Sequence, residues 1–97
     1  MLFLGMAISV SGMYKVMSNL EAGDGRPDIV MESLQPEMRP HIVIEMKQGE
    51  NLERLKQEAL RQIFEKNYYV KLKGKVLCVG LAHSKKRCEL VYEEIEN

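Results

Sequence analysis

What this sequence most clearly lacks is an excess of charge of either sign. Fourteen lysines and arginines balance fourteen aspartates and glutamates, so the formal net charge is zero. A neutral chain lacks the broad positive field that drives strong, indiscriminate binding to nucleic acid, although a local basic surface is compatible with it. Tryptophan is also absent, and the seven methionines are expected to help fill the core. With 97 residues, 45% of them apolar, the chain should form one domain with a modest core.

Cysteine is scarce, and only Cys78 and Cys88 are present. They fall on the two arms of a predicted hairpin that turns at residues 84–86. Folding that hairpin places Cys78 opposite a position near Tyr92, and not opposite Cys88. Two free thiols suit a reducing compartment, so the expected location is the cytoplasm.

Charge is missing altogether from residues 1–14. No basic residue precedes this apolar run, as a secretory signal would require, and the run is too short to span a bilayer as a helix. We therefore expect no membrane segment, but a largely buried helix over residues 2–10. Part of this segment is expected to stay exposed on a monomer and to be covered by a second copy, which predicts a homo-oligomer. The abrupt start also suggests a piece of a longer protein.

The rest of the chain predicts a mixed sheet with one further helix. That helix spans residues 51–66, with Asn51 as the expected N-cap and one apolar stripe on a charged cylinder. The stripe consists of Leu52, Leu55, Ala59, Leu60, Ile63 and Phe64. Strands are expected over residues 14–18, 28–33, 41–47, 75–82 and 87–95, the last of them at an edge. With the first helix, the order is αβββαββ, which is an α/β fold.

The third predicted strand carries an unusual pair of charges. Side chains alternate across a strand, so Glu45 and Lys47 project from the same face. The other face, with Ile42, Ile44 and Met46, is expected to be the one that faces the core.

The second and third predicted strands define a register if they pair as a hairpin. Their connection places Asp28 roughly opposite Glu45 and Ile29 opposite Ile44. Two like charges opposite each other on a sheet are unfavourable without a cation. Two carboxylates and the ammonium of Lys47 that converge on a sheet can hold Mg²⁺ and activate a water.

The chain thus has Pro27-Asp28 on its second predicted strand and Glu45-x-Lys47 on its third. This ordered set on an αβββαββ frame resembles the PD-(D/E)xK nucleases, whose fold is restriction-endonuclease-like. Residues 18–30 are similar to the nuclease-like domain at the C-terminus of bacterial proteins with an AAA-type ATPase-like domain, and residues 58–63, 67–68 and 80–82 continue the similarity. The resemblance implies one nuclease-like domain over residues 1–97, derived from a longer protein. Its implied partners are nucleic acid, first of all DNA, and an ATPase-like domain.

The resemblance also implies roles for individual residues. Asp28 and Glu45 match the metal-binding carboxylates, and Lys47 matches the lysine that orients or activates the attacking water. The metal would be Mg²⁺ or Mn²⁺, with the backbone carbonyl of Met46 as a further ligand. Glu21 matches an upstream acidic position that related nucleases sometimes use.

Three further residues are assigned to nucleic acid. Gln62 and Tyr68 are similar to a Gln…Tyr signature on the helix after Glu-x-Lys, although their spacing of six residues is longer than usual. Arg26 could hydrogen-bond a phosphate or neutralise Asp24.

Each candidate also has a plainer interpretation. Asp28 could be a turn residue that enters a strand, and Glu45 and Lys47 could be a solvated ion pair. Glu21 could be an acid in a turn, and Gln62 a surface glutamine.

The remaining polar residues are expected at the surface. His41 and His83 are interpreted as surface histidines. A basic set could follow a phosphate backbone or could simply be solvated. It comprises Lys66, Lys71, Lys73, Lys75, Lys85, Lys86 and Arg87. Two functions therefore stay open: a metal-dependent nuclease that hydrolyses phosphodiesters, or a catalytically inactive nuclease-fold module that binds nucleic acid or an ATPase-like partner.

Overall fold

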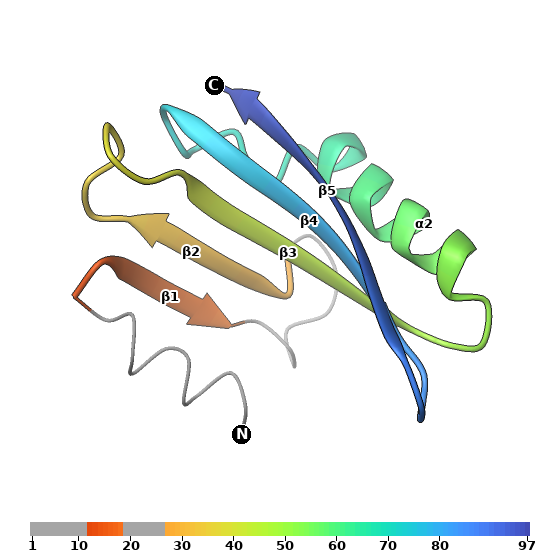
Figure 1. The fold of residues 1–97 in the computed structure, drawn as a ribbon. Helices are drawn as coiled ribbons and strands as arrows, with labels where there is room; N and C mark the ends of the chain where they lie inside the picture. The colour runs from red at the N-terminus through yellow and green to blue at the C-terminus, as the bar shows by residue number, and fades with distance from the viewer. Residues whose placement is uncertain (1–11, 19–26) are drawn as a thin grey trace.

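The computed structural model describes residues 12–18 and 27–97 (Figure 1). The predicted helix over residues 2–10 lies outside this part of the chain, as do Glu21 and Arg26. The described elements run in the order β1 (Tyr14–Ser18), β2 (Ile29–Ser33), β3 (His41–Gln48), α2 (Leu52–Glu65), β4 (Lys75–His83) and β5 (Cys88–Glu96). The five predicted strands and the second predicted helix are confirmed, with ends that differ by at most one residue.

The strands form one five-stranded sheet in the order β1-β2-β3-β4-β5. β1, β2 and β3 pair antiparallel, β3 and β4 pair parallel, and β4 and β5 pair antiparallel. The parallel pair requires a crossover connection, which α2 provides. The result is a mixed α/β architecture in which β5 is an edge strand, as predicted.

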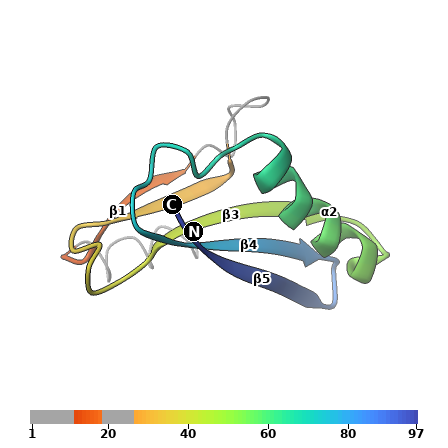
Figure 2. The same ribbon diagram turned by 90° about the horizontal axis from the view of Figure 1, so that it is seen from above.

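Helix α2 begins and packs as its sequence predicts. The side chain of Asn51 accepts a hydrogen bond from the backbone N–H of Arg54 over 3.1 Å, which caps the first turn. The buried residues of the helix are Leu52, Ala59, Leu60 and Ile63. Figure 2 shows the helix lying along one face of the sheet. Gly80 of β4 permits this close approach, because a Cβ there would meet the Lys56 carbonyl and lie 2.5 Å from the Leu60 amide nitrogen.

The prediction of which face of β3 enters the core is wrong. Val43 is fully buried and lies on the side covered by α2, in a cluster with Ile63, Val76 and Cys78. Ile42, Ile44 and Met46 are only half-buried, on the opposite face. Counting the apolar residues on each face of β3 favoured the wrong face, because the crossover helix, and not the strand itself, decides which face is covered.

The assignment of His41 to the surface is also wrong, because only 3% of this residue is exposed. Its Nδ1 accepts a hydrogen bond from the backbone N–H of Ser33 over 2.8 Å. Its Nε2 donates to the carbonyl oxygen of Lys73 over 2.9 Å. The ring therefore joins the end of β2 to the segment before β4. His83 is half-buried in its place at the end of β4.

Both cysteines are free thiols, as predicted. Cys78 lies opposite Glu93, one residue from the expected partner position. Burial raises the pKa of the Cys78 thiol to about 11, so this sulfur is a core group and not a nucleophile at neutral pH. Within the part of the chain that the structure describes, no helix is long and apolar enough to cross a membrane.

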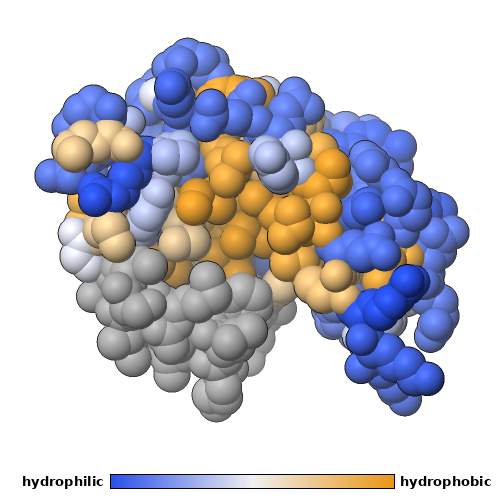
Figure 3. All heavy atoms as spheres, in the orientation of Figure 1, coloured by the Kyte–Doolittle hydropathy of each residue, from blue (hydrophilic) through white to orange (hydrophobic). Residues whose placement is uncertain are grey.

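The sheet face away from α2 carries many apolar side chains (Figure 3). Ile44, Val79 and Tyr92 stand in one row across β3, β4 and β5, and Leu81 and Leu90 belong to the next. Leu90 is 52% exposed and Tyr92 64% exposed. No described helix covers this face.

Candidate functional site

Asp28 and Glu45 meet where β2 begins. The predicted register is confirmed, since Ile29 pairs with Ile44 and Val30 with Val43. One position further out, the backbone N–H of Asp28 donates to Oε1 of Glu45 over 3.3 Å. In return, Oδ2 of Asp28 accepts a hydrogen bond from the backbone N–H of Met46 over 2.7 Å. The two carboxylates are thus held beside each other by reciprocal bonds between the strands.

Gln62 of α2 joins this pair to Lys47. Its side-chain nitrogen donates to Oε2 of Glu45 over 2.6 Å, and its side-chain oxygen accepts from Nζ of Lys47 over 2.7 Å. The same nitrogen lies 3.3 Å from the hydroxyl oxygen of Tyr68. The structure therefore brings five of the residues named from the sequence into one connected group, which we call the carboxylate cluster: Asp28, Glu45, Lys47, Gln62 and Tyr68.

The surroundings of Glu45 disfavour the ionised form of its carboxylate. The residue is only 5% exposed. Burial raises the pKa of its carboxyl group, the neighbouring Asp28 raises it further, and the Asp28 N–H, Lys47 and Lys66 oppose the shift without reversing it. The ionised form is therefore less favourable here than in water, and an added positive charge would relieve it.

The donor set fits a hard divalent cation. Two carboxylates supply the oxygen ligands that Mg²⁺ and Mn²⁺ prefer. In a strand, the N–H and C=O of one residue point to the same side, so the Met46 carbonyl is directed toward the side on which Asp28 lies. Among the described residues, no group of three or more His, Cys, Asp or Glu side chains could hold a metal. A metal here would therefore also need backbone, water or substrate oxygens, or a ligand from outside the described residues.

Sequence patterns place Lys66 only within a broad basic set, yet it lies near the carboxylate cluster. This lysine directly follows α2, four residues after Gln62, and is near enough to lower the pKa of Glu45. The signal that could have found it is the helical spacing, since residues four apart share one helix face. His41 and His83 are not part of the cluster.

Comparison with known proteins identifies a family for this chain. A family model described as the PD-(D/E)XK nuclease superfamily matches residues 1–93. No curated protein and no solved structure matches the chain.

Proposed function

Because this chain belongs to the PD-(D/E)XK nuclease superfamily, we propose that it is a metal-dependent nuclease that hydrolyses phosphodiesters of nucleic acid, with DNA as the main substrate. The observation that carries the proposal is that the carboxylates of Asp28 and Glu45 lie side by side, with Lys47 joined to Glu45 through Gln62. A surface ion pair would need neither a buried carboxylate nor a glutamine that bridges both charges.

Each residue has a distinct role in this proposal. Asp28, Glu45 and the Met46 carbonyl would hold Mg²⁺ or Mn²⁺, which supplies an activated water and offsets negative charge on the phosphate. Lys47 offsets the charge that develops on the phosphate oxygens in the transition state. Its ammonium has three donors and gives one to Gln62, so two can reach substrate. Gln62 holds the orientation of both Glu45 and Lys47.

Two residues outside the described part of the chain complete the proposal. Glu21 would add a carboxylate to the metal site, which has only two from the described residues. Arg26 would contact a phosphate of the nucleic acid, together with the hydroxyl of Tyr68.

The proposed partners extend beyond nucleic acid. An ATPase-like domain and a second copy of this chain are both proposed, and the support is the apolar sheet face with Leu90 and Tyr92 more than half exposed. Contiguous exposed apolar surface marks interaction sites. Sedimentation analysis should show a dimer, and Leu90→Glu should shift it to monomer; a monomer at all concentrations would contradict the second-copy proposal.

A catalytically inactive module is the second candidate function. The observation in its favour is that both oxygens of Glu45 already accept hydrogen bonds within the protein, one from Asp28 and one from Gln62. Such a carboxylate can serve as a structural link between β3 and α2 without any metal.

Cleavage and metal binding, measured together, decide between the two candidates. We expect the wild-type protein to nick plasmid DNA with Mg²⁺ or Mn²⁺. Asp28→Asn should abolish nicking and weaken metal affinity by at least about 10–100-fold, the loss seen when only the outer partners of metal ligands are removed. Lys47→Ala should reduce the rate by roughly 10²–10³-fold, as removal of one electrostatic donor does, while metal still binds.

Matched controls are Glu37→Gln and Lys75→Ala, which change exposed residues of the same types away from the carboxylate cluster. If the wild-type protein nicks nothing with either metal, or if Asp28→Asn and Lys47→Ala nick as fast as the controls, the inactive-module function replaces the nuclease.

A further inference from the structure

A groove lies directly beside the carboxylate cluster. It is lined by Pro27, Lys66, Asn67, Tyr68, Val70 and Lys71, and its volume is about 480 Å³. Small-molecule sites typically occupy about 300–1,000 Å³, so the groove has room for a group the size of a nucleotide.

The groove and the cluster share a wall. Pro27 immediately precedes Asp28, and the Tyr68 hydroxyl oxygen lies 3.3 Å from the Gln62 side-chain nitrogen. Lys66 also acts electrostatically on Glu45. A strand with a phosphodiester at the cluster would therefore pass next to this groove.

The lining is suited to a nucleotide more than to a simple anion. Lys66 and Lys71 are exposed cations, and among the described residues neither forms an ion pair. None of the described lining residues carries a carboxylate, while Val70, which is 50% exposed, and the half-buried Tyr68 add apolar surface. Cations beside an aromatic and an apolar side chain match a phosphate joined to a sugar and a base.

The outer wall of the groove is held in place before any ligand arrives. Asn67 has a left-handed backbone, with φ of 54°, and turns the chain after α2. The side-chain nitrogen of Asn97 donates to the carbonyl oxygens of Tyr69, Val70 and Leu72, over 2.9, 3.3 and 2.7 Å. A wall that is already ordered loses less conformational entropy on binding.

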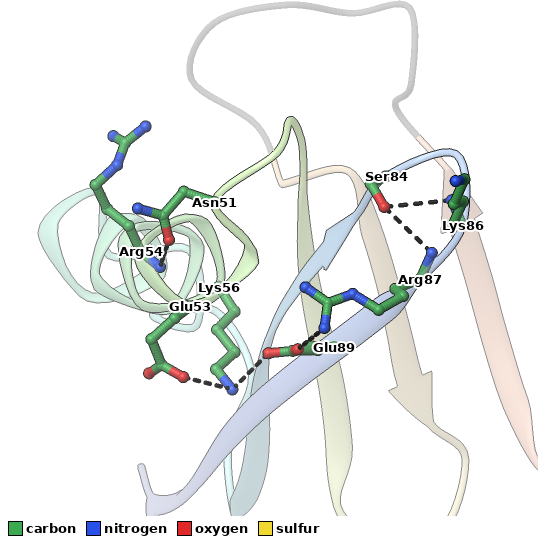
Figure 4. Close-up of polar contacts among 8 residues, drawn as sticks. All are labelled: Asn51, Glu53, Arg54, Lys56, Ser84, Lys86, Arg87 and Glu89. Atoms are coloured by element: carbon green, nitrogen blue, oxygen red, sulfur yellow. Dashed lines mark hydrogen bonds and ion pairs between the residues drawn. The ribbon is translucent and has the colours of Figure 1, made fainter.

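A second basic hollow differs in its surroundings. It lies at the β4–β5 hairpin and is lined by Ser84, Lys85, Lys86, Arg87 and Glu50. Figure 4 shows that Arg87 reaches Glu89, which also pairs with Lys56, and these ion pairs measure 3.8 and 3.1 Å. This hairpin carries its own carboxylates, and within the described part of the chain it forms no hydrogen bond or ion pair with the carboxylate cluster, so it provides a matched control.

We propose that the groove binds the nucleotide adjacent to the phosphodiester held at the carboxylate cluster. Lys66 and Lys71 contact its phosphate, and Tyr68 and Val70 contact its sugar and base. The inference rests on the proposed function and adds a substrate subsite to it.

Lys71→Ala is the most informative variant, because Lys66 lowers the pKa of Glu45 and its removal would also change the carboxylate cluster. Binding is measured by fluorescence anisotropy of a short labelled DNA strand in EDTA, over a series of salt concentrations. We expect weaker binding, with a salt slope reduced by about one for each lysine removed. In the double variant Lys66→Ala/Lys71→Ala, the salt slope should fall by about two. The control variant Lys85→Ala/Lys86→Ala should have a salt slope closer to that of the wild type than the slope of the Lys66→Ala/Lys71→Ala variant.

The cleavage assay separates this proposal from the nuclease proposal. In an active enzyme, Lys71→Ala should raise KM and leave kcat unchanged. Unchanged KM and unchanged salt slope, equal losses in the hairpin control, or a wild-type protein that does not bind the strand would each overturn the subsite. If the wild type binds through Lys66 and Lys71 but cleaves nothing, the subsite stands and the nuclease proposal fails. Thermal unfolding of each variant confirms that it is folded.

Discussion

The side-chain nitrogen of Gln62 donates a hydrogen bond to Oε2 of Glu45 over 2.6 Å. The bond joins α2 to β3 at the point where β2 begins, so the helix that covers the sheet also orients the buried carboxylate. Because the oxygen of the same amide accepts from Lys47, one side chain holds an acceptor and a donor of opposite charge at once. The site therefore depends on the docking of α2 and not on the strands alone.

The first prediction concerns Gln62 as a positioning residue. Gln62→Ala should weaken metal binding and lower the cleavage rate, since both Glu45 and Lys47 lose an orienting bond. We expect the metal affinity and the cleavage rate each to fall by about 10-fold or more, the scale found when outer partners of metal ligands are removed. Gln57→Ala is the control, because Gln57 lies on the same helix, is exposed, and its side chain bonds only to Glu53 among the described residues. Equal metal affinity for the two variants, measured by calorimetry, would contradict the positioning role.

The second prediction concerns the pH dependence of stability. The pKa of Glu45 is raised above 4.5 by burial and by Asp28. The protonated form of Glu45 is therefore favoured in the folded state. Its contribution to the free energy of unfolding is fully present below the unfolded pKa and is lost as the pH rises through the folded pKa. Between about pH 4 and pH 7, the free energy of unfolding of the wild type should fall relative to that of Glu45→Gln.

Urea unfolding of both proteins across that range checks the second prediction. Saturating Mn²⁺ at neutral pH should restore stability to the wild type and not to Glu45→Gln, because a bound cation favours the ionised carboxylate. A difference between the two proteins that does not change with pH would contradict the account of Glu45.

The third prediction concerns the packing of α2 on β4. Gly80→Ala should lower the free energy of unfolding by about 1–3 kcal/mol, the usual cost of overpacking a core. The added Cβ would meet backbone atoms of Lys56 and Leu60, which cannot move without shifting the helix. Gly12→Ala is the control, since a Cβ at Gly12 has nothing within 4 Å. Two chemical denaturation curves with the same midpoint would rule out this tight approach.

The fourth prediction concerns His41. His41→Ala leaves the Ser33 N–H and the Lys73 carbonyl oxygen without their present partner. Each buried polar group left unsatisfied costs about 1–3 kcal/mol, so the variant should be clearly destabilised. His83→Ala, at a half-buried position at the end of β4, should cost much less. If the two variants unfold at the same temperature, the hydrogen bonds of His41 are not important for stability.

The strand register and the extent of α2 could be predicted from the sequence, because both depend on local properties. Side-chain alternation and the length of the β2–β3 connection determine that Ile29 faces Ile44, which in turn brings Asp28 beside Glu45. The apolar stripe and the Asn51 cap determine where α2 begins and which side it buries.

The tertiary structure alone decided which face of the sheet α2 covers, and therefore which residues join the site. The apolar content of β3 favoured Ile42 and Ile44 as core residues, yet the crossover to β4 placed the helix over Val43 and Glu45. That docking buries Glu45, brings Gln62 to it and places Lys66 nearby. The physical reason is that alternation specifies two faces without saying which is covered, whereas the burial of a carboxylate depends on what packs above it.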